Sequence, residues 1–379
     1  MRAMVTCLTL SILTGLAALP AQAQTDIQET EQADFTLVTL ADGLDHPWSL
    51  APLPNGDFLV SERPGRLRYV AEGRLRPEPV TGLPDILADN QGGLLGLALH
   101  PEFETTRWVY FAFSEGTSSA NHTALGRGRL SEDGTSLEAV ETLFRVNIDK
   151  ARGYHFGGRI AFLADGTLIL SLGDGGLYRD EAQNLSNHLG TIIRLNEDGT
   201  VPFDNPFASA RGAQPEIYSW GHRNVQGIAI NPQTGSVWVN EHGPRGGDEI
   251  NLLRSGRNYG WPVISYGINY DGTPVSDATH AEGMEQPIWF WDPSIAPSAM
   301  AFYEGDEFPD WQGDLFIGAL AGEHLVRFEV EGDRIISTEN LLADWGERIR
   351  EVSLGPDGHL YLLTDSREGR LVRLDRVIP

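Results

Sequence analysis

A short unit, in which a turn containing glycine precedes an apolar strand, recurs along most of this 379-residue chain. Asn55-Gly56 before Phe58 is one example, and the pair is a frequent hairpin turn. The other copies begin at or near residues 108, 165, 234, 312 and 357. The copies lie roughly 45 to 80 residues apart, which suits propeller blades with insertions better than solenoid repeats.

Six such units predict an all-β fold, a six-bladed β-propeller of four-stranded antiparallel blades around a central channel. A β-sandwich is the competing fold, but it does not explain six similar units of this length. Long amphipathic helical patterns are nearly absent. Residues 35–40 and 371–374 are expected to share one blade and close the ring, which leaves no sheet edge free.

The first 23 residues are expected to be a secretory signal peptide. Arg2 precedes an apolar run, and small residues at Ala21 and Ala23 predict cleavage before Gln24. The single cysteine, Cys7, lies in this segment, so the mature chain is expected to have no disulfide. Residues 24–34 (QTDIQETEQAD) are expected to be a flexible acidic lead-in, and residues 35–379 one propeller domain. We therefore expect a periplasmic or secreted protein without stable membrane insertion.

The formal net charge of −25 argues against the basic surface that binds nucleic acid or an anionic membrane. We expect no nucleic-acid partner, and a monomer or homodimer.

The loops at one mouth of a propeller channel usually carry its function. His155 is the candidate general base, and Asp174, near the end of the next strand, is expected to hold the second nitrogen of its imidazole. Gln91 lies beside two glycines that allow close backbone approach. Arg223, followed by Asn224, is placed to polarise a carbonyl or clamp a carboxylate.

Residues 238–253 (WVNEHGPRGGDEINLL) resemble an oxygen-rich ion cradle. Glu241, Asp248 and Glu249 supply carboxylates, and the glycines let the backbone present carbonyl oxygens, the ligand set that Ca²⁺ prefers. Farther on, Arg348 and Arg350 are expected on one side of a strand. Two adjacent guanidinium groups need an anion between them, so with Arg223 they indicate an acidic, multi-carboxylate ligand.

Several motifs, in this order along the chain, are together similar to those of the soluble quinoprotein glucose and aldose sugar dehydrogenases. The match runs from about residue 43 to 374 and includes QGGLLG at 91–96, HPEF at 100–103, HFGGR at 155–159, LGD at 172–174, GHRNVQG at 221–227, the cradle, NYGWP at 258–262 and PSIAPS at 293–298. The resemblance implies a propeller that binds pyrroloquinoline quinone (PQQ) and Ca²⁺. It also implies oxidation of the anomeric carbon of aldose sugars to a lactone, with electrons passing to a soluble or membrane acceptor.

The resemblance also implies a role for each candidate residue. His155 takes the sugar hydroxyl proton while hydride passes to the quinone C5, Asp174 supports His155, and Arg223 polarises the quinone carbonyl. Gly243 and Pro244 present carbonyls to the Ca²⁺ that binds the quinone. The other implied cofactor contacts are Gln91, Asn224, His242, Asp248, Ser294, Arg348 and Arg350, and the implied ligands of a separate structural Ca²⁺ are Glu249 and Tyr259.

The chain departs from the glucose enzymes at several positions. Those enzymes have glutamine in place of His242, a cofactor-contacting lysine in place of Ala321, and tryptophan in place of Asp292. A further ligand of the structural metal, near Asn269, has no clear counterpart. These differences favour the aldose sugar dehydrogenase branch, with broad sugar specificity.

Two other functions stay open from the sequence alone. A Ca²⁺-dependent propeller hydrolase, of the lactonase or phytase-like kind, explains the carboxylates and His155 but not the Arg348/Arg350 pair with Arg223. A propeller that only binds a partner is the other alternative, and the fold by itself does not separate it from an enzyme.

Overall fold

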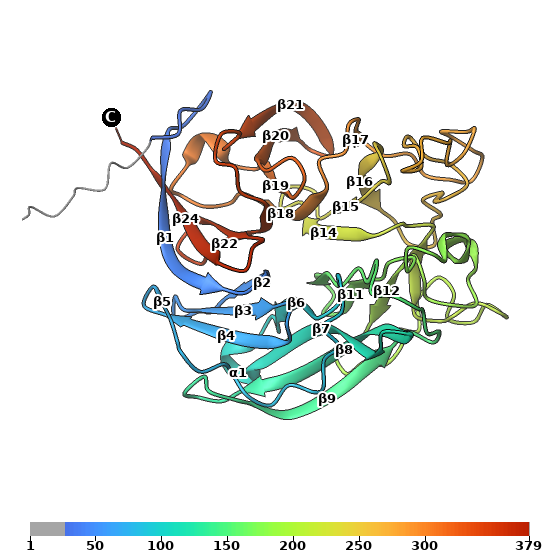
Figure 1. Cartoon of the computed structure of the whole chain (residues 1–379), viewed down its shortest axis with the longest axis horizontal. Helices are drawn as coiled ribbons and strands as arrows, with labels where there is room; N and C mark the ends of the chain where they lie inside the picture. Colours follow the sequence, from blue (N-terminus) through green and yellow to red (C-terminus); the bar gives the residue numbers. More distant parts are fainter. Residues whose placement is uncertain (1–26, 379) are drawn as a thin grey trace, which may run out of the picture.

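The structure is a computed structural model that describes residues 27–378, and these residues form a ring of six four-stranded antiparallel sheets (Figure 1). This arrangement confirms the predicted six-bladed β-propeller. The expected signal peptide, residues 1–23, lies outside the described residues.

The blades are numbered 1 to 6 in chain order. The strands of blades 1 to 3 are β2 (Pro47–Pro52), β3 (Phe58–Glu62), β4 (Arg66–Ala71), β5 (Arg74–Leu75), β6 (Leu94–Leu99), β7 (Trp108–Thr117), β8 (Ala120–Leu130), β9 (Leu137–Arg145), β10 (Ile160–Phe162), β11 (Leu168–Ser171), β12 (Thr191–Leu195) and β13 (Ile217–Trp220). The strands of blades 4 to 6 are β14 (Val225–Ile230), β15 (Val237–Glu241), β16 (Asp248–Leu253), β17 (Trp289–Trp291), β18 (Pro297–Phe302), β19 (Leu315–Ala319), β20 (Leu325–Glu331), β21 (Arg334–Leu341), β22 (Ile349–Leu354), β23 (Leu360–Thr364), β24 (Gly369–Arg376) and, from the N-terminal side, β1 (Phe35–Leu44). The helices of the described part are short: α1 (Phe103–Thr106), η1 (Arg179–Gln183) and η2 (Pro309–Trp311).

The recurring units of the sequence become the second strand of every blade: β3, β7, β11, β15, β19 and β23. Of these, β3, β11, β19 and β23 are buried along their whole length. Each lies between two strands of its own sheet, and both of its faces pack against neighbouring blades. That position explains why the units read as continuous apolar runs rather than as alternating patterns.

The first strand of each blade lies toward the centre of the ring. Strand β2 contacts β6 and β22, and β18 contacts β14 and β22, so the inner strands of successive blades touch around the channel. The loops that lead into these inner strands consequently converge at one mouth of the channel.

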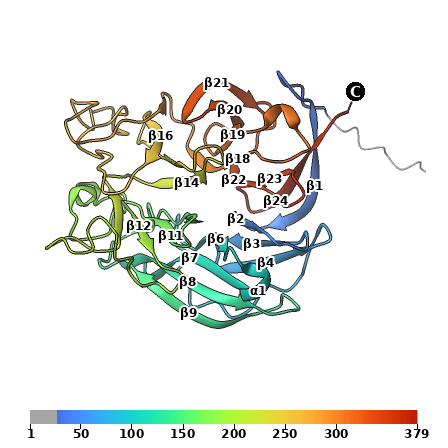
Figure 2. The ribbon, with the colours of Figure 1, turned by 180° about the vertical axis from the view of Figure 1, so that it is seen from behind.

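The N-terminal strand closes the ring. Strand β1 pairs antiparallel with β24, with Phe35 opposite Arg376 and Leu44 opposite Gly369 (Figure 2). Phe35 is fully buried, and its ring packs edge-on against Trp311 at 5.9 Å between centroids. The expected pairing of the two terminal segments is confirmed.

The segment 24–34 is expected from its composition to be flexible, yet its described part makes defined contacts. Gln28 forms an isolated bridge with Phe35, and Arg327 Nη1 donates to Gln32 Oε1 at 2.6 Å. Ala33 is buried in the core of the last two blades. The described residues of this segment therefore lie against blades 5 and 6, because a buried arginine and an apolar pocket hold them there.

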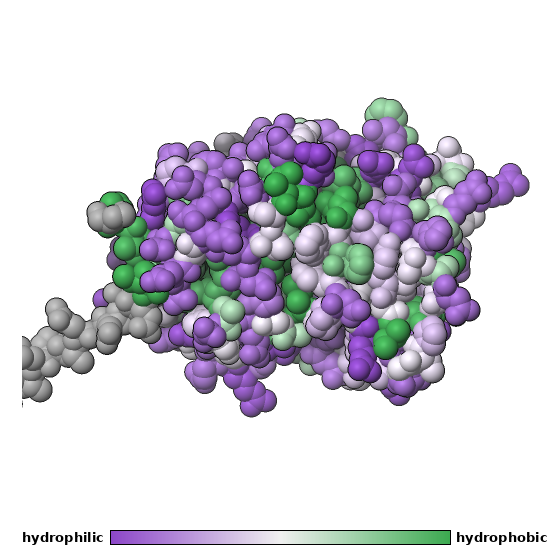
Figure 3. Space-filling model, turned by 90° about the horizontal axis from the view of Figure 1, so that it is seen from above, coloured by the Kyte–Doolittle hydropathy of each residue, from purple (hydrophilic) through white to green (hydrophobic). Residues whose placement is uncertain are grey.

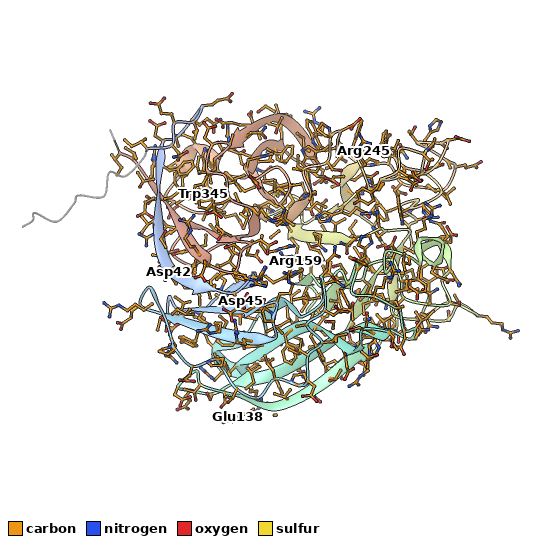
Figure 4. All side chains as sticks on the ribbon, in the orientation of Figure 1. Asp42, Asp45, Glu138, Arg159, Arg245 and Trp345 are labelled. Atoms are coloured by element: carbon orange, nitrogen blue, oxygen red, sulfur yellow. The ribbon has the colours of Figure 1, made fainter. Side chains whose placement is uncertain are left out.

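A buried ion pair crosses the channel below the converging loops. Arg159 lies near the centre of the ring (Figure 4), where Nη1 is 2.5 Å from Glu351 Oε2 and Nε donates to the Gln226 carbonyl at 2.6 Å. Its guanidinium stacks 4.2 Å from the Trp48 ring. The pair therefore links blades 1, 3, 4 and 6.

The outer surface is largely polar where Figure 3 shows it. The side seen from above is mostly hydrophilic with separate hydrophobic patches (Figure 3). Within residues 27–378, no helix is both long enough and apolar enough to cross a membrane.

The Arg159–Glu351 pair provides a test of the channel packing. Arg159→Met is expected to lower the free energy of unfolding by about 3–5 kcal/mol, because Glu351 is left buried without its charged partner. Denaturant unfolding of the purified protein measures the change. The double variant Arg159→Met, Glu351→Leu should recover most of the loss, since neither charge remains. A single variant as stable as the wild type would contradict this account of the channel.

Candidate active site

A cavity of about 270 Å³ lies at the mouth where the loops converge. Every blade contributes to its wall, which is lined by Trp48, Arg63, Gln91, Leu95, Phe156, Gly157, Asn224, Gln226, His242, Ala296, Leu320, Arg348, Arg350 and Asp365. Five of the implied cofactor contacts are among these residues: Gln91, Asn224, His242, Arg348 and Arg350. The structure therefore brings these five residues together, although Gln91 and Arg350 are 259 positions apart in the sequence.

His155 and Asp174 form a hydrogen-bonded pair beside this cavity. Nδ1 of His155 lies 2.6 Å from Asp174 Oδ1, and the backbone N–H of His155 donates to Gln91 in the cavity wall. Asp174 also accepts hydrogen bonds from Trp261 Nε1 at 2.8 Å and from the Gly176 N–H at 2.7 Å. Since the carboxylate accepts Nδ1–H, the neutral imidazole keeps Nε2 as a proton acceptor. The expected contact between the two residues is confirmed.

Close backbone packing brings this pair together. A Cβ atom at Gly173 would lie 2.2 Å from the carbonyl oxygen of His155, so the approach needs a glycine. His155 itself adopts a φ of 45°, in the left-handed region. The Asn224 side chain accepts the Gly157 N–H at 3.1 Å, which ties the His155 loop to blade 4.

His155 and Asp174 are both buried, and their pKa shifts favour charge states that suit proton transfer. Burial lowers the pKa of His155, the hydrogen bond to Asp174 opposes the shift, and Arg223 adds to it. Burial works against ionisation of Asp174, but His155 and Arg223 together hold the pKa of this carboxyl below its ordinary value. The resting pair is therefore a neutral imidazole and an ionised carboxylate.

Arg223 and His242 lie in two loops of blade 4, before β14 and after β15, and hydrogen bonds join these loops. Nη1 of Arg223 donates to the carbonyls of His242 at 3.1 Å and Gly243 at 2.8 Å, and Glu241 accepts the Arg223 backbone N–H at 2.6 Å. The Nε2 atom of His242 lies 2.8 Å from the Pro297 carbonyl and donates to it. Burial, with Arg223 and Arg350 nearby, lowers the pKa of His242 to about 3. His242 is thus a neutral residue in the cavity wall, with Nδ1 as its hydrogen-bond acceptor.

Asp248 and Ser294 lie outside the cavity wall and bond to each other. Asp248 accepts hydrogen bonds from the Ser294 hydroxyl at 3.0 Å and from the N–H groups of Gly243 at 2.7 Å and Ala296 at 2.8 Å. Burial raises the pKa of Asp248 against the effect of these bonds. In this structure the two residues brace the His242 turn against blade 5.

The remaining cradle residues line a second, much smaller pocket. Its wall contains Arg223, Glu241, His242, Gly243, Gly247, Glu249, Tyr259 and Trp261, among others, but not Pro244. Burial and the nearby Glu241 raise the pKa of Glu249 well above its ordinary value. The Tyr259 hydroxyl donates to the Leu252 carbonyl at 2.6 Å and accepts the Arg254 N–H at 2.8 Å, so it is already satisfied.

The arginine pair has an anion from the chain itself. Arg350 Nη2 lies 2.9 Å from Asp365 Oδ2, and Arg348 Nη2 lies 3.4 Å from the same oxygen. The side chain of Arg348 is 45% exposed, whereas that of Arg350 is 8% exposed. Asp365 therefore supplies one negative charge to the pair, and the binding of an acidic ligand by the two arginines stays a prediction.

Four residues of the site are not among the predicted site residues, although one of them, Trp261, lies within the NYGWP motif at 258–262. Asp365 and Arg63 line the cavity, and Trp261 orients Asp174. Lys150, the only lysine of the chain, lies buried behind the pair, with Nζ 3.3 Å from the centre of the Phe156 ring. Burial lowers the pKa of Lys150 to about 7. Each is an ordinary loop or strand-end residue in the sequence, and only the convergence of the blades makes it part of the site.

The structure also shows where the residues lie that differ from those of the glucose enzymes. Ala321 is exposed, and it follows Leu320 of the cavity wall. Asp292 lies against the turn at Gly246, where an added Cβ would be 2.8 Å from Asp292 Oδ1. The Asn269 side chain accepts Arg179 Nη1 at 3.3 Å.

The charges of the cavity fit an acidic ligand. Arginines outnumber carboxylates in its wall, and within the described residues the buried Nε of Arg350 has no hydrogen-bond partner. For Ca²⁺ the donors are less complete, since residues 27–378 contain no group of three or more His, Cys, Asp or Glu side chains placed to hold a metal. The Gly243 carbonyl has a second lone pair beyond the one used by Arg223, so a cation there would depend on backbone oxygens.

Comparison with known proteins agrees with this picture. Residues 44–373 match the family described as Glucose / Sorbosone dehydrogenase. The chain is 44% identical over 346 residues to aldose sugar dehydrogenase YliI of Escherichia coli K12, covering 90% of this chain and 93% of the relative.

Two solved structures are similar over nearly their whole length. The apo form of the soluble aldose sugar dehydrogenase of Escherichia coli superimposes with a TM-score of 0.87 at 44% identity, covering 90% of this chain and 100% of that one. The PQQ-bound aldose sugar dehydrogenase of Streptomyces coelicolor superimposes with a TM-score of 0.73 at 31% identity, covering 91% and 99%.

The resemblance seen in the motifs is thereby confirmed over most of the propeller, from residue 44 to residue 373. The chain belongs to the glucose/sorbosone dehydrogenase family.

Proposed function

We propose that this protein is an aldose sugar dehydrogenase that oxidises the anomeric carbon of the sugar to a lactone, with PQQ and Ca²⁺ as cofactors. The observation that carries the proposal is the hydrogen bond from His155 Nδ1 to Asp174, which leaves Nε2 as the proton acceptor. The two residues that follow His155, Phe156 and Gly157, line the arginine-containing cavity. The names of the Escherichia coli and Streptomyces coelicolor relatives support the reaction type and the cofactor.

The protein residues manage the proton of the reaction. Nε2 of His155 takes the proton of the anomeric hydroxyl, and the C–H bond of the same carbon loses its hydrogen as hydride, which leaves the lactone carbonyl. Asp174 stabilises the imidazolium that forms, and Trp261 and Gly176 keep the carboxylate in place. Arg223 keeps a positive charge near His155, which favours the neutral base before the reaction.

When bound, PQQ supplies the acceptor for the hydride. Gln91, Asn224 and His242 would hold it through neutral polar groups, while Arg348 and Arg350 would bind its carboxylates. Gly243 and Pro244 would offer carbonyl oxygens to the associated Ca²⁺. Glu249, whose pKa burial raises, and Tyr259 belong to the position proposed for a structural Ca²⁺.

The setting of the reaction is also part of the proposal. We place the protein in the periplasm or outside the cell, with the electrons passing from the cofactor to a soluble or membrane acceptor. The departures at Ala321 and Asp292 favour broad sugar specificity over a preference for glucose. The chain would act as a monomer or homodimer.

Reconstitution tests the reaction directly. Purified protein mixed with PQQ and Ca²⁺ should reduce a redox dye when aldoses are added, and omission of PQQ or chelation of Ca²⁺ should remove the activity. A panel of pentoses, hexoses and disaccharides reports the specificity. Failure to bind PQQ, together with no dye reduction for any sugar, would end the proposal.

The role of His155 as general base predicts that its removal lowers kcat without weakening PQQ binding. His155→Ala should lower kcat by about 10²-fold or more, because the proposed general base is removed, while the Kd for PQQ changes little. His280→Ala, which removes an exposed histidine, is the matched control and should behave as the wild type. Loss of PQQ binding in His155→Ala would mean that His155 holds the cofactor instead.

The pH dependence follows from the same base. His155 must be neutral to act, and burial lowers its pKa, so kcat/KM should fall with decreasing pH only below the ordinary histidine value. Asp174→Asn removes the carboxylate that opposes this shift. The variant should lose about 10³-fold or more in kcat and move the acid limb to still lower pH. An unchanged limb in Asp174→Asn would show that another group controls the profile.

A further inference from the structure

Arg63 is a third guanidinium in the cavity wall, and it comes from the blade next to the one that carries the Arg348/Arg350 pair. It lies in the turn between β3 and β4 of blade 1, whereas the pair belongs to blade 6. Its backbone N–H donates to the His46 carbonyl at 3.0 Å. A Cβ at Gly93 would lie 1.8 Å from the Arg63 carbonyl oxygen and 2.8 Å from its Cγ, so the glycine-rich loop after Gln91 packs directly on the stem of Arg63.

The backbone of Arg63 is held, but its charged group is not paired. Within the described residues 27–378 the Arg63 guanidinium makes no hydrogen bond or ion pair. Its nearest acidic residues already have partners: Asp45 bonds Arg66 at 3.2 Å and His46 at 2.7 Å. Asp365 bonds Arg350 and Arg348. Burial lowers the pKa of Arg63, yet the group stays charged because arginine remains protonated at any ordinary pH.

The charges around Asp365 do not balance. Three arginines, Arg63, Arg348 and Arg350, act on this carboxylate, and they lower its pKa to about 2 although burial opposes the shift. Three positive charges against one negative charge leave an excess of two. The other ionisable groups nearby do not change this net charge. Arg159 and Glu351, below the cavity, neutralise each other, and His242 is uncharged.

We propose that Arg63 is an anion-binding residue of the cavity, forming with Arg348 and Arg350 a three-arginine site for a ligand with several carboxylates, and that Asp365 is their internal counter-ion. This inference rests on the proposed function, because it assumes that PQQ is the ligand with several carboxylates. Arg63 provides a positive charge from blade 1, whereas Ala321 of blade 5 provides none.

Direct binding to the apo-protein tests the role of Arg63 without turnover. Calorimetric or fluorescence titration with PQQ in Ca²⁺ buffer should give a Kd for Arg63→Met roughly ten- to hundredfold weaker than that of the wild type, the loss of one charge-assisted contact. Arg74→Met removes an exposed arginine of the same blade and should leave the Kd unchanged. Arg63→Met keeps an unbranched apolar stem against Gly93, removes no hydrogen bond or ion pair, and relieves repulsion from Arg348 and Arg350, so it should unfold at a denaturant concentration no lower than that of the wild type.

A second probe isolates the charge of the ligand. The trimethyl ester of PQQ lacks ionised carboxylates, so the difference between Arg63→Met and the wild type should disappear with the ester. The added substitution Ala321→Lys should restore part of the binding of PQQ to Arg63→Met. Equal Kd values for wild type and Arg63→Met with PQQ would overturn the inference, whereas a wild type that does not bind PQQ at all would instead overturn the proposed function.

Removal of the counter-ion Asp365 should change PQQ binding in the opposite direction to removal of Arg63. Asp365→Asn should bind PQQ more tightly than the wild type, because the carboxylates of the ligand no longer compete with Asp365. The same variant should unfold at lower denaturant concentration without PQQ and regain stability with it, since three uncompensated arginines repel one another. Weaker PQQ binding in Asp365→Asn would contradict the counter-ion role.

Discussion

The pairing of β1 with β24 is the constraint on which the rest of the structure depends. A propeller sheet left open would expose unpaired backbone groups at its edges, and the N-terminal strand removes that edge by completing blade 6. Closure sets the positions of all six inner strands relative to one another. The cavity wall takes residues from every blade, so the site is defined only once the ring is complete.

Burial then determines the electrostatics of the site. The surface of this chain is acidic, with a net formal charge of −25, while the cavity at its centre contains an excess of arginine. His155 and His242 are buried there, and burial disfavours the charged form of histidine. His155 and His242 are both neutral for this reason, but only His155 has a carboxylate partner to stabilise its protonated form. The two histidines therefore suit different tasks, proton transfer and neutral contact with a ligand.

The chain also uses its own carboxylates to position cationic groups. Glu241 accepts the backbone N–H of Arg223, Asp248 braces the turn that carries His242, and Asp365 holds the late arginine pair. In each case an acidic residue orders a group at the wall from behind or beside it. Such bracing keeps the wall preorganised, so that binding a ligand need not order these side chains at that moment.

The sequence by itself determined the fold class and much of the site. Six apolar runs after turns are enough to predict six blades, because a strand buried on both faces needs a continuous apolar run. The sequence around His155, Arg223 and Arg348 also identifies loops that carry candidate site residues. The tertiary structure decided which charges meet. Asp365 and Arg63 have no motif, and they join the site because closure brings blade 6 beside blade 1. It also placed Asp248 and Ser294 behind the wall rather than in it, since their hydrogen-bond partners are neighbouring backbone groups. Local patterns specify strands and loops, whereas contacts between distant loops depend on how the whole ring closes.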